Sequence, residues 1–213
     1  AQNDPYTAYA RLYEKNHSEE ALTYLLNTSM SRGYLDDALM YIREARRRRG
    51  DTQNLLFREY TVQRRLGNRR AAIVLLERIH TMYPSNQEVS EELCAIRLEE
   101  VRRQMDLNKY EEVIPMLEKL QTFSVDQETK TAIERRLLTC YIQTGKRQKA
   151  LNQLEKSYSD PAKRAAMYEE IVTPYIKQLM AEGRLRQAEA EIIKVLNNEN
   201  PSPDILRMGI TTA

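Results

Sequence analysis

The sequence predicts an all-α fold built from short helices that pack as successive antiparallel hairpins. Apolar residues recur at helical spacing along almost the whole chain, as in residues 22–30. A glycine and an alanine also recur in step after 34 residues: Gly33 and Ala38 are followed by Gly67 and Ala72. A fixed period of this size is typical of a chain that stacks one small helical unit. No segment alternates with a period of two over a useful length, so no sheet is expected.

Helix-breaking residues divide the pattern into its elements. The breaks fall at Gly33, Gly50, Gly67, Pro84, Asn108, Gly145, Pro161, Gly183 and Pro201. They predict helices over 5–15, 18–31, 34–49, 53–66, 69–82, 86–106, 109–122, 126–144, 147–158, 161–182 and 185–197, with a short helix beginning at 203. Ser18, Asp126 and Asp160 are suited to cap the free amides at three of the helix starts. The connections are short, so neighbouring helices should run antiparallel.

The repeat loosens toward the C-terminus. The turn positions after Gly67 are Asn108, Gly145 and Gly183, which gives gaps of 41, 37 and 38 residues. The first gap exceeds 34 by seven residues, or about two helical turns, and these fit the long helix at 86–106. Two prolines fall inside expected helices. Pro115 is near a helix start, whereas Pro174 is deeper and is expected to kink or split its helix.

The composition limits the class of protein. The chain has 213 residues, of which 41% are hydrophobic, enough for a folded protein. No apolar run approaches the ~18 residues that a membrane span needs. Cys94 and Cys140 lie inside helical patterns, have no metal-ligand spacing and are expected to be buried thiols.

The glycine and alanine turns resemble those of tetratricopeptide repeats (TPR). The resemblance covers roughly residues 19–201, and its small residues let paired helices approach closely; these are Ala38, Ala72, Ala150 and Ala188. It implies a right-handed α-α superhelix of about five to six helix hairpins, formed by residues 1–213 as a single array. In this array residues 1–18 form an N-terminal helix, 19–201 about five hairpins, and 202–213 the start of a further helix or a truncated cap. The chain departs from the family pattern in having no tryptophan and in its longer later units.

Charge is unevenly distributed although the net charge is only +2. Residues 43–70 carry ten arginines against three acidic residues, and residues 86–134 carry twelve acidic residues against six basic ones. These stretches are either solvated helix faces, a basic patch for an acidic partner, or halves that pack on another copy of the chain. The run Arg46 to Arg49 spans the circumference of a helix and therefore cannot form one flat binding face.

The residues that could carry catalysis are sparse. His17 and His80 have no Ser or Cys nucleophile at a meaningful spacing, and the paired carboxylates are adjacent in sequence, so they point in different directions on a helix. There is no glycine-rich phosphate loop and no zinc pattern. We therefore expect no catalytic residues, no metal and no cofactor, and a protein that is not an enzyme.

The resemblance to TPR proteins implies a binding surface. In that family the first helix of each pair lines a concave groove that holds a peptide or a partner helix. The residues that map to this groove are Asn27, Asn54, Phe57, Thr61, Arg64, Arg65, Arg102 and Arg135. Their arginines favour an acidic or carboxylate-bearing partner. The leading hypothesis is a non-catalytic scaffold that binds a protein or peptide in this groove.

Two further hypotheses remain open from the sequence. The chain starts without a methionine at Ala1 and stops within a helical pattern, which favours the extracytoplasmic TPR portion of a larger envelope secretion, export or sensor protein. A helical repeat that binds RNA or another nucleic acid is the second, and the irregular gaps argue against one base per repeat. Self-association is expected through the C-terminal apolar residues Ile205, Leu206, Met208 and Ile210.

Overall fold

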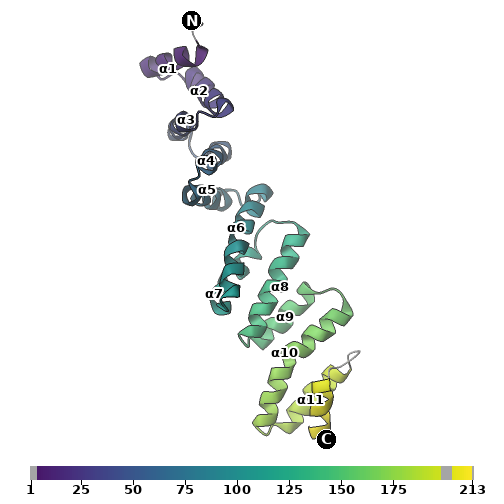
Figure 1. Cartoon of the computed structure of the whole chain (residues 1–213). Coiled ribbons are helices and arrows are strands. Elements are labelled where there is room, and N and C mark those ends of the chain that lie inside the picture. The colour runs from purple at the N-terminus through teal and green to yellow at the C-terminus, as the bar shows by residue number, and fades with distance from the viewer. Residues whose placement is uncertain (1–3, 198–202, 213) are drawn as a thin grey trace. The chain divides into compact units, whose positions relative to one another are not determined.

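The computed structural model describes residues 4–197 and 203–212, which fold into twelve helices and contain no strand (Figure 1). The chain divides into two compact units, residues 1–93 and 94–213, and the division falls within helix α6 (Gln87–Asp106). The helix bounds agree with the sequence-based expectation to within two residues at every described end. The prediction of an all-α fold of helix hairpins is confirmed.

The first unit contains five helices and the start of α6. These are α1 (Pro5–Asn16), α2 (Glu19–Arg32), α3 (Leu35–Arg49), α4 (Gln53–Arg65) and α5 (Arg69–Met82). Each helix packs on the next one along the chain, from α1 on α2 through to α4 on α5. The core lies along these contacts and includes Leu22, Leu25, Ile42 and Leu56, whose side chains are fully buried. Such nearest-neighbour packing is the physical basis of a repeat fold, because each hairpin buries its apolar face against the next.

The second unit, taken by itself, has the same kind of arrangement. It contains the rest of α6 and α7 (Tyr110–Leu120), α8 (Gln127–Gln143), α9 (Arg147–Ser157), α10 (Pro161–Ala181), α11 (Leu185–Leu196) and α12 (Pro203–Thr212). From α7 onward each helix again packs on its successor. Ile133, Leu137, Leu138 and Ile176 are among its fully buried side chains. The helix α10 runs through Pro174, so of the two outcomes expected at this proline, a kink or a split, the split does not occur.

The turn inside each hairpin repeats the same backbone geometry. The five residues at the turn have positive φ angles between 57° and 78°: Gly33, Gly67, Asn108, Gly145 and Gly183. In each turn the amide of the following residue donates to a carbonyl five positions back, as Asn68 does to Gln63 at 2.9 Å. This closes the helix end and reverses the chain. Five residues after each turn, a small or β-branched side chain is buried in the hairpin: Ala38, Ala72, Val113, Ala150 and Ala188.

Local capping explains where several helices begin. The side chains of Ser18, Asp126 and Asp160 accept from backbone amides in the first turns of α2, α8 and α10, as the sequence predicts. Asp4 and Thr52 do the same for α1 and α4. Each cap satisfies one of the amides that a helix start leaves without a partner.

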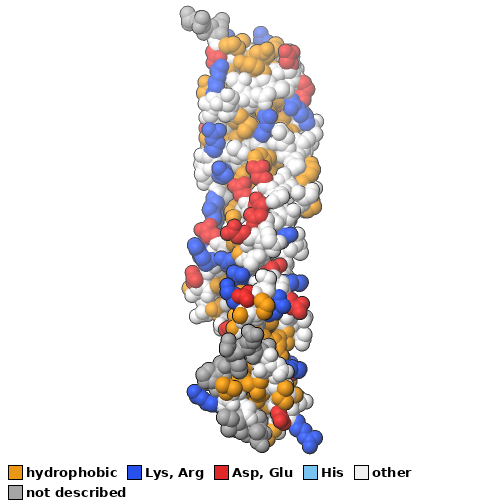
Figure 2. Space-filling model, turned by 90° about the vertical axis from the view of Figure 1, so that its right-hand side faces the viewer, with side chains coloured by type: hydrophobic (Ala, Val, Ile, Leu, Met, Phe, Trp, Pro, Cys, Tyr) orange, Lys and Arg blue, Asp and Glu red, His pale blue; other side chains and the backbone are white. Residues whose placement is uncertain are grey.

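The surface carries both charge signs. On the face drawn in Figure 2, basic and acidic side chains both occur along the chain, and apolar side chains reach the surface between them. Within the described residues, no helix combines the length and the apolar character that crossing a bilayer requires.

Candidate functional site

The groove residues expected in the first unit lie on the first helices of two consecutive hairpins. Asn27 is on α2, and the others are on α4: Asn54, Phe57, Thr61, Arg64 and Arg65. At 3.6 residues per turn, the five α4 positions fall within an arc of about 100°. None of the five is fully buried. We call this surface the Phe57 face.

Phe57 is the apolar element of this face. Its half-buried ring lies 5.6 Å from the ring of Tyr60, with the two planes inclined by 51°. The hydroxyl of Thr61 donates to the carbonyl of Phe57 at 3.0 Å. The Thr61 hydroxyl is therefore held by its own helix, and its methyl group and the Phe57 ring are the apolar features of the face.

Asn27 connects the face to the preceding hairpin. Its side-chain oxygen accepts a hydrogen bond from Nη1 of Arg58 on α4 at 2.7 Å. This contact joins α2 to α4 across one hairpin and orients the amide of Asn27. Sequence reasoning did not single out Arg58, although it lies 31 residues after Asn27, close to the repeat length.

The basic character of the face is partly balanced by Glu92. Nη1 of Arg64 lies 3.0 Å from Oε1 of Glu92 on α6, and the hydroxyl of Tyr60 donates to the same oxygen. The Arg64 guanidinium also lies over the Tyr60 ring, 6.0 Å from its centroid. Burial, followed by the hydrogen bond to Glu92, raises the pKa of Tyr60. Arg65 is exposed and supplies positive charge to the rim of the face.

The remaining two expected residues lie in the second unit. Arg102 is exposed on α6, and Arg135 is exposed on α8. The guanidinium of Arg135 lies 4.8 Å from the centroid of the Tyr158 ring, and its Nε donates to the carbonyl of Ser157 at 3.3 Å. Arg135 therefore packs on the end of α9 and attaches that helix to α8.

The run of four arginines at the end of α3 spreads in several directions, as expected from its sequence. Arg46 points inward and contacts Asp51 and Glu59. Arg47 pairs with Glu44 on its own helix. Arg48 donates to the carbonyl of His17, and Arg49 donates to Glu19 and Thr23 on α2. The run therefore holds α3 to its neighbours and does not present one cationic surface.

The titratable residues that the structure describes show no arrangement for metal binding. Within the described residues, no three His, Cys, Asp or Glu side chains are grouped so that they could hold a metal ion. Cys94 and Cys140 are buried, as expected, and burial raises the pKa of the Cys140 thiol to about 11.

The chain was compared with protein families, with curated proteins and with solved structures. No family model matches the sequence, and no curated protein matches it. A solved TPR repeats protein from Bacteroides fragilis NCTC 9343 is 13% identical, with 98% of this chain and 88% of that chain covered at a TM-score of 0.51. A tetratricopeptide repeat protein from Parabacteroides merdae ATCC 43184 is 15% identical over 97% of this chain and 90% of that chain, at a TM-score of 0.38. A TPR protein from Thermus thermophilus is 16% identical over 92% of this chain and 98% of that chain, at a TM-score of 0.34.

The likeness to the Bacteroides fragilis protein shows that this chain has a tetratricopeptide-type fold. The resemblance carried by the glycine and alanine turns is thereby confirmed at the level of the fold.

Proposed function

We propose that the chain is a non-catalytic protein-interaction scaffold, and that it binds a peptide or protein segment on the Phe57 face. The observation that carries this proposal is the half-buried aromatic ring of Phe57 on helix α4, where exposed polar and basic side chains share its face. An aromatic anchor surrounded by polar groups is the arrangement that concentrates binding energy at protein interfaces. The fold supports the proposal, because stacked helices offer extended surfaces and need no deep pocket.

The hydrogen bonds of this face favour recognition of an extended or helical segment. Asn27 is oriented by Arg58, so its amide nitrogen is presented to the surface in a fixed place. Arg65 is exposed about two turns after Phe57 on the same helix and can pair with a carboxylate of the bound segment. We therefore expect ligands that combine an apolar side chain for Phe57 with acidic residues nearby.

Selection from a peptide library followed by affinity measurement tests the proposal. Peptides selected on the purified chain should bind Phe57→Ala and Arg65→Glu about tenfold more weakly than the unchanged chain. Arg11→Glu is the matched control for the charge reversal, because Arg11 is exposed on α1 and lies outside the face. If the selected peptides bind all of these variants equally, or if no peptide is selected, the Phe57 face is not a binding site.

A further inference from the structure

A second surface of the first unit lies on the opposite side of α4. Glu59 and Gln63 are about 160° around the helix from Phe57 and Thr61, and both are buried. Above them, α3 and α5 form the walls of a groove of about 720 Å³. We call it the outer groove, and the side chains that matter in it are Arg43, Arg46, Arg69, Arg70, Arg78 and Val74.

The outer groove has a surplus of positive charge. Arg43 and Arg46 share the buried carboxylate of Glu59, and Arg46 and Arg78 share the carboxylate of Asp51. Two carboxylates thus serve three guanidinium groups. Arg70 adds a further positive charge and has no ion pair within the part of the chain that the structure describes. A surplus of arginine favours carboxylate ligands, since the planar guanidinium can donate two parallel hydrogen bonds.

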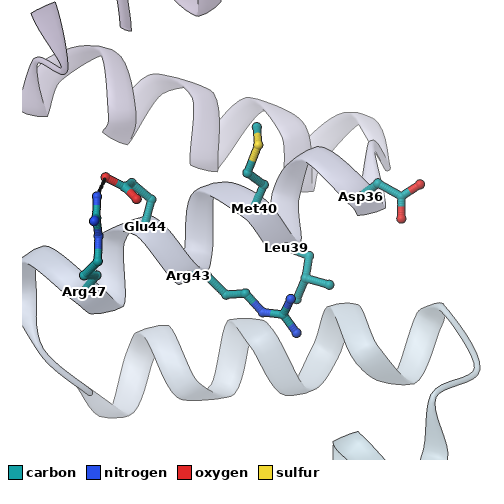
Figure 3. Close-up of a pocket in the computed structure, with 6 residues that line it drawn as sticks. All are labelled: Asp36, Leu39, Met40, Arg43, Glu44 and Arg47. Carbon is teal, nitrogen blue, oxygen red and sulfur yellow. Dashed lines mark hydrogen bonds and ion pairs between the residues drawn. The ribbon is translucent and has the colours of Figure 1, made fainter. Parts of the chain in front are cut away.

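The same groove also offers apolar contact. Val74 on α5 is 57% exposed although it is a large aliphatic residue in the groove wall. The opposite wall of the groove is α3. Figure 3 shows that Leu39 and Arg43 point away from one side of this helix and that Met40 points away from its opposite side. These α3 residues line an adjoining hollow of about 460 Å³ that shares Arg43 with the outer groove, and Met40 is 54% exposed there. The outer groove therefore combines its arginines with the exposed apolar side chain of Val74.

We propose that the outer groove is a second docking site, separate from the Phe57 face, and that it takes an acidic amphipathic segment of a partner protein. Carboxylates of the segment pair with Arg70, Arg43 and Arg78, and an aliphatic side chain covers Val74. This inference goes beyond the proposed function, because it does not require the Phe57 face to bind anything.

The lining of the groove favours protein over nucleic acid. None of its lining residues is aromatic. Single-stranded nucleic acids are held by stacking on aromatic side chains in addition to charge, and that element is missing from this groove. Exposed Val74 gives no advantage to a phosphate backbone, whereas it suits a leucine or isoleucine side chain.

The test uses the purified full chain and a fluorescein-labelled peptide of about 15 residues, four helical turns, with Glu and Leu at helical spacing. The peptide should bind, and its affinity should fall with added salt because the contacts are electrostatic. Arg70→Glu should weaken binding about tenfold, and Val74→Ser by a smaller factor of about three.

Arg70 is the second residue of α5, where an acidic residue suits the helix N-terminus, so Arg70→Glu should fold normally. Circular dichroism and thermal unfolding verify this. A peptide with Gln in place of Glu should also lose about tenfold in affinity.

Further controls decide between alternatives. Arg11→Glu makes the same charge change elsewhere in the unit and should leave the affinity unchanged. If Arg65→Glu weakens binding of the peptide and Arg70→Glu does not, the peptide occupies the Phe57 face. This result would support the proposed function and overturn the proposal for the outer groove. If a single-stranded oligouridine binds more tightly than the peptide and depends on Arg70, the groove is a nucleic-acid site and the proposal is overturned. If Arg70→Glu instead converts a dimer to a monomer in sedimentation, the occupant is a second copy of the chain and the proposal of a partner segment is overturned. Absence of any peptide binding at low salt also overturns the proposal.

Discussion

The carboxylate of Glu59 on α4 is buried, with 3% of its surface exposed, and accepts a hydrogen bond from the guanidinium of Arg46 on α3. Arg43 donates to the other oxygen of Glu59 at 3.0 Å, and Arg46 also donates to Asp51 at 2.8 Å. This network joins two consecutive hairpins of the first unit, since α3 closes one hairpin and α4 opens the next. It also forms the floor of the outer groove.

Removing Arg46 should destabilise the first unit. Arg46→Met keeps most of the side-chain volume but leaves Glu59 buried with Arg43 as its remaining partner, and the Arg43 side chain is 60% exposed. The expected loss is about 2–4 kcal/mol in the free energy of unfolding, measured by urea denaturation. The double variant Arg46→Met with Glu59→Leu should recover at least half of this loss, because no buried charge is then left unpaired. If Arg46→Met is as stable as the unchanged chain, the network does not contribute to the free energy of unfolding.

The stability of the first unit should depend on Asp51 and on pH. The hydrogen bond that Asp51 accepts from Arg46 is the main cause that lowers the pKa of Asp51. The nearby charges of Arg46 and Arg78 lower this pKa further. The folded pKa therefore lies below the unfolded value of about 3.9, so the stabilisation is present above that value and is lost as pH falls through the folded pKa.

Asp51→Asn should accordingly cost about 1 kcal/mol at neutral pH and almost nothing in strong acid. Urea denaturation at several pH values measures this difference. Glu155→Gln is the control, because Glu155 is exposed on α9 and makes no ion pair with a described residue. A cost for Asp51→Asn that stays constant down to about pH 2 would contradict the assignment.

The turn glycine and the helical glycine should respond oppositely to alanine. Gly67 has a φ of +78°, and no atom lies within 4 Å of the place that a Cβ would take, so Gly67→Ala is penalised by the backbone alone, by about 1 kcal/mol. Gly209 lies within α12, where an added Cβ would meet Ile192 at 3.5 Å, an ordinary contact. Gly209→Ala should therefore raise stability by about 0.5 kcal/mol. Thermal unfolding of the two variants should shift in opposite directions, and equal shifts would contradict this interpretation of the turns.

The Cys140 thiol should be unreactive in the folded chain. Burial raises its pKa to about 11, well above the value of about 8.5 for a free cysteine. Because the folded pKa is raised, the associated stability is present below about pH 8.5 and is lost as the pH rises toward 11. With Cys94→Ala leaving one thiol, a disulfide reagent at about pH 8 should react only as fast as the chain opens. Rapid reaction in the absence of denaturant would show that Cys140 is accessible.

The C-terminal end differs in part from the surface expected there. In α12, Ile205 and Met208 are buried and Leu206 is 47% exposed, while the side chain of Ile210 lies outside the described residues. Two of the four residues expected to mediate self-association are thus used to cover α11. Self-association through this end stays a prediction, and it now depends on Leu206 and on the exposed residues of α11, Ile193 and Leu196.

The sequence by itself determined the helices, their turns and three of their caps. These features depend on contacts within a few residues: the spacing of apolar side chains, a glycine at positive φ after a helix, and a serine or aspartate before one. Asn108 fits the same rule, because asparagine tolerates the left-handed conformation better than most residues. Pro174, which was expected to kink or split its helix, lies inside α10 and does not end it.

Only the tertiary structure decided which polar groups meet. Arg58 with Asn27, Arg64 with Glu92 and Lys146 with Glu111 are pairs separated by 28 to 35 residues, about one repeat. Their partners depend on how far each helix is rotated against the next, and a shift of one residue turns a side chain by about 100°. The repeat length therefore indicates roughly which residues lie one hairpin apart. The burial of Glu59 and the surplus of arginine in the outer groove arise only when three helices are packed together.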